Sequence, residues 1–599
     1  MTTHDGTSTT GTGARRLGYM PGIDGLRTVA VAAVVIYHLG AAWLPGGYLG
    51  VDVFLVISGF LITSLLLAEH RVSGRIDLRR FWMRRARRLL PAVLVMMAVV
   101  LAYMLVMHAG EVGRLRGEVL AALVYVINWH FIFADVPYFE QFGRPSVLLH
   151  LWSLAIEEQF YLIWPPLLVL GLLAVGRRAI LGLVVLAAVG STVLAWALYE
   201  PFSDPSRIYY GTDTRAVALL VGVALALVPG AIRSVDPDPG NRLRRRGREV
   251  VGFLCAAGVL GFMFTLGDLD ERLYQGGFLV VALATAGVVV VAADPTSVIG
   301  RALGTAPLVW LGLRSYGIYL WHWPVIMLTR PGVDVPLDGA ALVALRVALT
   351  LAAAALSYRF VEVPFRRHGF AGLRRALGQG GGLLGRPVRI AAASSAVLAV
   401  AALVFAVALA PTQAVSVPGL SADGRAGGQS EEPLVSDRDG AEPQLLFVGD
   451  SVMLGASSAL QTAFGDRAIV DAATGRRFPE GAAIVKGHLR RLGPDTVVVV
   501  HLGNNYFVEP TQLEGLLSEL ADRPRVLLVT VRVPLPWQDS VNTAITDAAA
   551  AYPNVTVVDW FSRSSAPGLL VDGAHMNERG MRLYTEEIQA ALDEAPDRR

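Results

Sequence analysis

Long apolar runs recur along the first 410 residues, and they limit what the chain can fold into more than any other feature. A helix needs about 20 apolar residues to cross a bilayer. Lipid offers the backbone no hydrogen-bond partners, so such runs fold as helices rather than open strands. The 599-residue chain is 54% hydrophobic and only 17% charged. The sequence predicts eleven membrane helices, ten in one group and one further along: 26–43, 50–68, 89–107, 151–174, 179–198, 213–229, 250–267, 276–293, 306–328, 339–360 and 389–410.

Arginine clusters indicate the orientation of these helices, because cytoplasmic loops carry an excess of Lys and Arg. The clusters lie at 15–16, 71–88, 242–248 and 366–389. All of them fall on the cytoplasmic side if a further apolar run, 117–134, makes no net crossing. We therefore expect a multi-pass protein of the plasma (inner) membrane with a cytoplasmic N-terminus. Everything after about residue 411 is then extracytoplasmic.

Composition changes along the chain define six segments and exclude some partners. The net charge of +3 says little about nucleic acid, but there is no basic stripe with interleaved aromatics, so no nucleic acid partner is expected. The single Cys255 cannot form an intramolecular disulfide, and no metal-binding pattern is present. The expected segments are a disordered cytoplasmic tail (1–20), a transmembrane domain (21–370), a basic cytoplasmic loop (371–388), one further membrane helix (389–410), an extracytoplasmic linker (411–443) and an α/β domain (444–599).

Two ionisable residues share one face of the first predicted membrane helix. Arg27 and His38 are eleven residues apart, which is about three helical turns and about 16 Å along the axis. Ionisable groups inside a membrane are costly and often functional, although a helix–helix hydrogen bond is an equally open interpretation. A histidine titrates near neutrality and can act as a general base, and an arginine can hold an anion. Asp52, at the start of the next helix, is placed to orient or charge-balance His38.

The loop 79–91, RRFWMRRARRLLP, has two interpretations. It can be a simple inside-positive anchor of the membrane topology. It can also be a phosphate clamp for a nucleotide-bearing donor, because guanidinium forks suit diphosphate oxygens. In a helix, Arg84 would share a face with Arg87 and Arg88.

Other polar residues at the membrane helices are candidates for supporting roles. His150, Glu157 and Glu158 lie in HLWSLAIEEQFY, where adjacent glutamates are hard to explain as lipid contacts. His322 lies between two tryptophans and can equally belong to an interfacial aromatic belt. Glu362 ends the tenth helix and can equally form a local salt bridge.

Seven segments together resemble the acyltransferase-3 family of membrane proteins, in the family's order and over about residues 20–370. No single segment is decisive, but seven in register make a chance likeness improbable. They are GIDGLRTVAVAAVVIYH (22–38), GGYLGVDVFLVISGFLI (46–62), FWMRRARRLLP (81–91), LLHLWSLAIEEQFYLIWP (148–165), YYGTDTRAVALLVG (209–222), SYGIYLWHWP (315–324) and LSYRFVEVPFR (356–366).

The resemblance implies an activity and roles for matching residues. The family moves acyl groups, commonly acetyl, from cytoplasmic acyl-CoA to sugars or lipids at or beyond the outer face. His38 would be its essential histidine, in the Arg–ten residues–His motif, and Glu362 its acidic residue near the end of the tenth helix. No tightly bound cofactor is implied, because acyl-CoA is a donor substrate. The donor-binding residues would be Arg27, Arg84, Arg85, Arg87 and Arg88.

Residues 444–592 alternate apolar strands with helical patterns, which predicts a three-layer α/β fold. Strands are expected within 444–453, 496–505, 525–534 and 554–560, with a closing helix in 571–588. Polar residues follow these strands, where open α/β sheets bind ligands.

A set of residues typical of acyl transfer follows these strands. Ser451 comes directly after the first strand and can open a helix, which exposes a nucleophile. His575 is the best candidate for its base, with Asp572 three residues earlier to orient it. The backbone at Ser451 and Gly475, with the Asn505 side chain, could form an oxyanion hole.

These blocks resemble the SGNH hydrolase family. Its four blocks match Gly449-Asp450-Ser451, Gly475, Gly503-Asn504-Asn505 and Asp572-Gly573-Ala574-His575. A fusion of acyltransferase-3 and SGNH parts resembles an architecture associated with O-acylation of cell-envelope glycans.

The favoured hypothesis is an acyl relay that ends on a hydroxyl of an extracytoplasmic glycan or glycolipid. His38 would act as base or carrier, and Ser451 would form an acyl-enzyme. Direct transfer by the membrane domain stays open. An esterase anchored in the membrane is the main alternative, because the sequence does not separate water from a sugar hydroxyl as the acceptor. A transporter is a third possibility.

Overall fold

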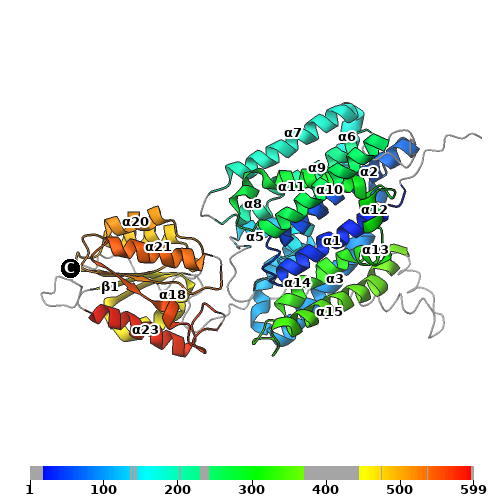
Figure 1. The fold of residues 1–599 in the computed structure, drawn as a ribbon. Helices are drawn as coiled ribbons and strands as arrows, with labels where there is room; N and C mark the ends of the chain where they lie inside the picture. The colour runs from blue at the N-terminus through cyan, green and yellow to red at the C-terminus, as the bar shows by residue number, and fades with distance from the viewer. Residues whose placement is uncertain are drawn as a thin grey trace, which may run out of the picture. The chain divides into compact units, whose positions relative to one another are not determined.

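The computed structural model describes residues 18–134, 136, 138, 145–200, 204–229, 242–367, 369, 444–473, 475–535, 537–571 and 573–594. The chain divides into two compact units, a helical unit and a C-terminal α/β unit (Figure 1). Each unit is described by itself. The predicted helix 389–410, the linker 411–443 and the tail up to residue 17 lie outside the described residues.

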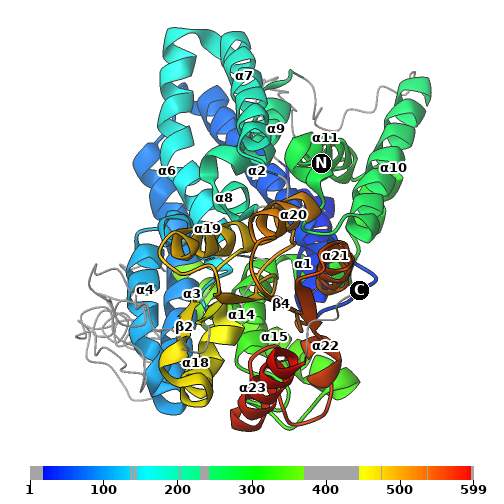
Figure 2. The same ribbon diagram turned by 90° about the vertical axis from the view of Figure 1, so that its left-hand side faces the viewer.

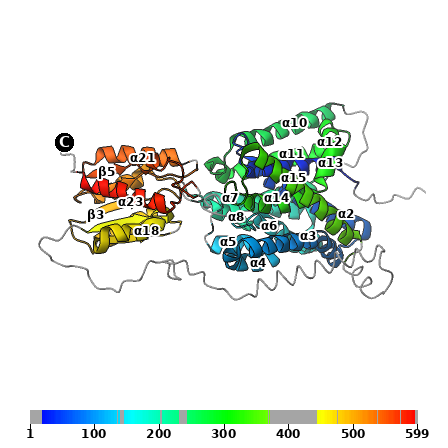
Figure 3. The same cartoon turned by 90° about the horizontal axis from the view of Figure 1, so that it is seen from below.

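The helical unit is a bundle of long and short α-helices (Figures 1 and 3). Short helices interrupt the long ones, and two π-turns occur at Leu273–Gly277 and Tyr358–Glu362. The α-helices are α1 (Pro21–His38), α2 (Gly50–Ser73), α3 (Leu78–Met107), α4 (Leu115–Leu123), α5 (Ile127–Phe133), α6 (Leu151–Ala174), α7 (Gly176–Ala197), α8 (Ser206–Tyr210), α9 (Thr212–Leu227), α10 (Arg242–Thr265), α11 (Phe278–Ala292), α12 (Val298–Leu303), α13 (Ala306–Gly312), α14 (Ser315–Met327) and α15 (Gly339–Ser357).

Seven helical segments in the described part of the chain are long and apolar enough to cross a membrane, and each overlaps a predicted span. Among the other predicted spans, 26–43 corresponds to the 18-residue α1 and 213–229 to the 16-residue α9, while 306–328 is broken into α13 and α14. The run 117–134 folds as α4 and α5, of nine and seven residues, so neither reaches the length of a crossing. The total of eleven crossings stays a prediction.

Close backbone contacts fix helix α1 within the bundle. Gly22 lies against the carbonyl of Ala292 at the end of α11, and Gly25 lies against the carbonyl of Leu303 at the end of α12. A Cβ at either glycine would overlap these carbonyls. Small residues at helix interfaces allow such close approach in membranes. Helix α1, which carries Arg27 and His38, therefore packs closely against the ends of α11 and α12.

Helices α2 and α9 pack together in the same way. Gly59 of α2 lies against the backbone of Leu219, and Gly222 of α9 lies against the backbone of Val56. This contact brings polar residues of the two helices together at one end of the pair.

The C-terminal unit is a parallel five-stranded sheet in the order β2-β1-β3-β4-β5. Helices α18 and α23 cover one face, and α19, α20 and α21 cover the other (Figures 1 and 2). The predicted three-layer α/β class is confirmed. The strands are β1 (Leu445–Gly449), β2 (Ala468–Ala472), β3 (Val497–His501), β4 (Val526–Val529) and β5 (Val555–Val558), and the helices are α18 (Ser451–Phe464), α19 (Phe478–Leu489), α20 (Pro510–Glu519), α21 (Gln538–Ala551), α22 (Trp560–Arg563) and α23 (Glu578–Asp593).

The strand order places a change in the direction of the connections at the carboxyl ends of β1 and β3. The chain turns from β1 to β2 on one side and then returns to β3 on the other. In open α/β sheets, ligands bind where the connections diverge in this way. Ser451 follows β1, and Asn504 and Asn505 follow β3, so the fold gathers the predicted chemical groups at this edge.

Candidate active sites

The nucleophile candidate Ser451 is the first residue of helix α18. Asp450 caps this helix, with its Oδ1 accepting a 3.0 Å hydrogen bond from the backbone N–H of Val452. The side chain of His575 lies beside Ser451, with its Nε2 3.0 Å from Ser451 Oγ. This is the separation at which a base can take the proton of a hydroxyl nucleophile. The sequence-predicted Ser–His pair therefore comes together in the fold.

A tight loop presents His575. The backbone N–H of Val571 donates a 2.8 Å hydrogen bond to the carbonyl of His575, and Gly573 between them has φ +90°. Asn577 then caps helix α23 by accepting bonds from the N–H groups of Arg579 and Gly580. The predicted orienting residue Asp572 lies outside the described residues, so its role stays a prediction.

The two predicted oxyanion-hole residues lie on adjoining segments. Gly475 has φ +72°, a conformation that favours glycine. Asn505 is buried, and its Nδ2 donates a 3.1 Å hydrogen bond to the carbonyl of Arg476. The loop after β2 is therefore tied to the loop after β3. Stabilisation of an oxyanion by these groups stays a prediction.

Sequence reasoning missed a buried network beneath the nucleophile. Asn504 Nδ2 donates to the Asp450 carboxylate at 3.0 and 3.2 Å and also lies 3.2 Å from His501 Nε2. His501 Nδ1 lies 2.8 Å from the hydroxyl of Tyr584 on α23. Burial raises the pKa of Asp450 to about 6 and lowers the pKa of His501 to about 3. The signal was present in Asn504, the middle residue of Gly-Asn-Asn, but no local pattern identifies its partners.

Arg476 makes a second missed connection. Its guanidinium donates a 3.2 Å hydrogen bond to the carbonyl of Gly449 at the end of β1 and a 2.7 Å hydrogen bond to Asp471 Oδ1 on β2. Asp471 Oδ2 lies 2.8 Å from His488 Nε2. These two bonds, from His488 first and then Arg476, lower the pKa of Asp471 to about 2. Arg476 therefore ties the backbone next to the nucleophile to the loop that carries Gly475.

In the helical unit, the contacts of His38 differ from the predicted ones. His38 Nδ1 lies 3.0 Å from His322 Nε2, and His38 Nε2 lies 3.3 Å from the hydroxyl of Tyr138. Asp52 instead forms an ion pair with Arg215 of α9, in which Asp52 Oδ2 lies 2.8 Å from the guanidinium and both side chains are buried. The prediction that Asp52 orients His38 is therefore wrong. The physical reason is the close α2–α9 packing, because a buried carboxylate needs an opposite charge.

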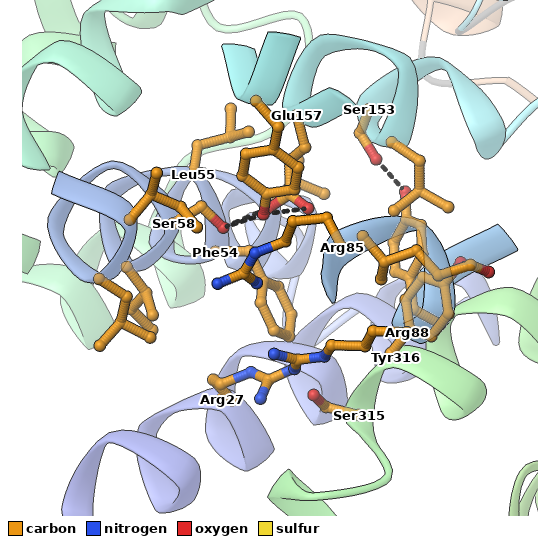
Figure 4. A pocket seen from close by; sticks show the side chains of 18 of the residues that line it. Arg27, Phe54, Leu55, Ser58, Arg85, Arg88, Ser153, Glu157, Ser315 and Tyr316 are labelled. Carbon is orange, nitrogen blue, oxygen red and sulfur yellow. Dashed lines mark hydrogen bonds between the residues drawn. The ribbon is translucent and has the colours of Figure 1, made fainter. Parts of the chain in front are cut away.

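Three of the five predicted donor-binding arginines line one cavity of about 150 Å³ (Figure 4). These are Arg27, Arg85 and Arg88, and Figure 4 shows the guanidinium groups of Arg27 and Arg88 side by side. The cavity does not take Arg84 and Arg87, and half-exposed Arg84 instead pairs with Glu69 at 3.4 Å. The three-residue spacing of Arg85 and Arg88 selects this face of α3. Arg84, Arg87 and Arg88 do lie on one helix, as the shared-face prediction requires, and donor binding by any of the five arginines stays a prediction.

Predicted supporting residues surround the cavity and the histidines. Glu157 lines the cavity and accepts a 2.6 Å hydrogen bond from Ser58, while Glu158 lines a smaller cavity. His150 Nε2 lies 3.1 Å from the carbonyl of Leu320. Glu362 is buried and packs against Gly317 of α14.

In the described part of the chain, helices long and apolar enough to cross a membrane are joined to an α/β unit with a Ser–His pair, which is the arrangement of a membrane-bound enzyme that acts on acyl groups. The acyltransferase-domain family matches residues 20–359. The chain is 37% identical over 628 residues to the peptidoglycan O-acetyltransferase OatA of Listeria monocytogenes, covering 96% of this chain and 98% of that protein. YrhL of Bacillus subtilis is 35% identical over 96% of this chain and 98% of its own length.

The chain belongs to the acyltransferase-3 family and is a membrane O-acetyltransferase. This confirms the family resemblance and the enzyme class predicted from the motifs. Both relatives match nearly the whole chain, so they share the C-terminal unit. One solved structure similar to this chain is the C-terminal catalytic domain of peptidoglycan O-acetyltransferase A of Streptococcus pneumoniae, with a methylsulfonyl adduct. The match covers 26% of this chain and 94% of that domain, with 24% identity and a TM-score of 0.22.

Proposed function

We propose that this protein transfers acetyl groups from cytoplasmic acetyl-CoA to hydroxyl groups of peptidoglycan at the outer face of the plasma membrane. The helical unit takes the acetyl group from the donor, and the α/β unit passes it to the glycan. The name of the Listeria relative, which matches 96% of this chain, supports peptidoglycan as the acceptor. The arginine clusters support a cytoplasmic donor side.

The observation that carries the proposal is the 3.0 Å contact between Ser451 Oγ and His575 Nε2. His575 Nε2 takes the Ser451 proton as Oγ attacks the acetyl carbonyl carbon. The bond from that carbon to the leaving group breaks, and the leaving group takes the proton from His575. An acceptor hydroxyl then gives its proton to His575 Nε2, and its oxygen attacks the acyl carbon. The bond from that carbon to Ser451 Oγ breaks, Ser451 takes the proton back, and the acetyl ester stays on the glycan. In this proposal the backbone N–H of Ser451, the first residue of α18, stabilises the developing oxyanion.

The arginine cavity supports the donor half of the proposal. Arg27, Arg85 and Arg88 supply positive charge, and Phe54 and Leu55 supply apolar wall. Guanidinium groups bind phosphate oxygens strongly. A volume of about 150 Å³ is below the roughly 300 Å³ at which ligand pockets begin. The cavity would therefore receive one part of the donor.

The test uses the full chain in sealed vesicles with labelled acetyl-CoA on the cytoplasmic side. Acid-stable label on the wild type that is lost in both Ser451→Ala and His38→Ala supports the relay through an acyl-serine. Label lost only in His38→Ala places the covalent step in the helical unit and overturns the role of Ser451. A Ser–His pair also serves ester hydrolysis, so ester cleavage that depends on Ser451 and needs no acetyl-CoA would replace the proposal with an esterase.

A further inference from the structure

His322 is fully buried beside His38, and its position was not explained by the sequence. It lies on α14, a helix distant in sequence from α1, yet its Nε2 is 3.0 Å from His38 Nδ1. A residue of an interfacial aromatic belt would be partly exposed, whereas His322 has no exposed surface. The belt interpretation therefore does not fit, and His322 needs another account.

The hydrogen-bond partners fix the protons of both imidazoles. His322 Nδ1 lies 2.6 Å from the backbone carbonyl of Tyr319, which can only accept, so His322 Nδ1 carries a proton. In a neutral ring the other nitrogen, Nε2, is then an acceptor. His38 Nδ1 faces this acceptor, so it must carry a proton and donate it.

The same logic leaves a lone pair on the other nitrogen of His38. With its proton on Nδ1, neutral His38 presents an unprotonated Nε2, which faces the hydroxyl of Tyr138 at 3.3 Å. His38 is only partly buried, so this nitrogen belongs to the more accessible member of the pair. Two positive imidazoles in contact would repel, which favours a neutral His322 when His38 gains a proton.

We propose that His322 is a positioning residue that fixes the tautomer of His38, so that His38 Nε2 is the basic nitrogen of the helical unit. The inference rests on the proposed function, in which His38 is the base. The hydroxyl of the acyl acceptor gives its proton to His38 Nε2, and its oxygen attacks the thioester carbonyl carbon. The carbon–sulfur bond breaks, and the thiolate takes the proton from Nε2 to give free CoA thiol. The His38 Nδ1–H bond to His322 persists throughout and strengthens when His38 is cationic.

The geometry separates His322→Gln from His322→Asn. The amide oxygen of Gln reaches the position of Nε2 and can accept from His38, whereas the amide of Asn reaches only the position of Nδ1. Asn therefore keeps the bond to the Tyr319 carbonyl and loses the one to His38, and Gln does the reverse. A purely structural role would make these two variants similar, and His322→Phe removes both bonds.

The experiment measures release of CoA thiol from acetyl-CoA by the full chain in vesicles, with thermal unfolding of each variant as a folding check. We expect His322→Gln to keep kcat within about tenfold of wild type. His322→Asn and His322→Phe should lose at least a further tenfold in kcat, with KM for acetyl-CoA unchanged, because His322 does not line the arginine cavity that is proposed to anchor the donor. Equal kcat for the folded Gln and Asn variants, or full kcat for Phe, would overturn the inference.

His38→Ala separates failure of this inference from failure of the proposed function. Loss of CoA release in His38→Ala with the expected order among the His322 variants supports both. Loss of CoA release in His38→Ala, without the expected order of kcat among the His322 variants, overturns only the proposed role of His322. Unchanged release in His38→Ala would remove the base itself and overturn both proposals.

Discussion

The buried network beneath Ser451 predicts how the stability of the α/β unit responds to acid. The pKa of His501 is lowered to about 3 in the folded state, from an ordinary value of 6.5. The unfolded chain therefore takes up a proton first, and stability is lost as pH falls below 6.5. Asp450 acts oppositely, since its pKa is raised from 3.8 to about 6. Its contribution is gained as pH falls through 6 and lost as pH rises through that value.

The two effects can be compared between pH 7 and pH 5. Proton linkage gives a loss of about 2 kcal/mol from His501 and a gain of about 1 kcal/mol from Asp450. Asp471, whose pKa is held at about 2, contributes only below this window. The wild-type unit should thus lose no more than about 1 kcal/mol on acidification, because the two groups offset each other.

Two substitutions should expose the opposing contributions. Asp450→Asn keeps a good helix cap but removes the acid-favouring group, so this variant should lose about 2 kcal/mol from pH 7 to pH 5. His501→Gln should instead gain about 1 kcal/mol over the same change. Hydrogen exchange of peptides from β1 and β3 in the full chain, corrected for intrinsic exchange at each pH, reports these free energies. An Asp450→Asn variant with the wild-type response would refute the reasoning.

Three further predictions concern activity. Arg85→Ala should raise KM for acetyl-CoA about 10- to 100-fold through loss of a charged hydrogen bond. The control Arg84→Ala lies outside the cavity and should change KM less than about twofold. Steady-state kinetics in vesicles measures both variants, and equal effects would contradict the assignment of Arg85 to the donor site. Asn505→Ala should lower kcat for transfer to glycan about 10²- to 10³-fold with little change in KM, and an unchanged kcat would exclude it from the oxyanion hole. Arg476→Met should lower the same kcat about tenfold by releasing the loop after β2, measured beside the exposed control Arg490→Met, which should behave as wild type.

Local spacing allowed part of the site to be predicted. Arg27 and His38 share one helix, so their relation follows from the helical repeat alone. Ser451 and His575 were predictable because each follows a recognisable strand or loop block, and parallel strands bring such ends to one edge. The four strands named from the sequence are all present, and β2, which has fewer apolar residues, was not singled out.

Contacts between elements were not predictable from spacing. Asp52 pairs with Arg215 because glycines let α2 and α9 approach closely, and no sequence pattern gives that crossing. The partner of His38 comes from α14, far along the chain. The choice of Arg85 over Arg84 depends on the rotation of α3, which its packing sets. In each case tertiary packing decides which of several equivalent faces meets the site.

Helix α1 sets the separation between Arg27 and His38. Gly22 and Gly25 let the helix pack closely against the backbone carbonyls of Ala292 and Leu303, where a Cβ at either glycine would clash. Arg27 and His38 are therefore kept about 16 Å apart along a rigid rod. In the proposed function, a donor that is anchored by its anionic end at Arg27 must span that length to bring its reactive carbonyl to His38. Carrier length, rather than the size of the acyl group, would then decide which thioesters this protein accepts.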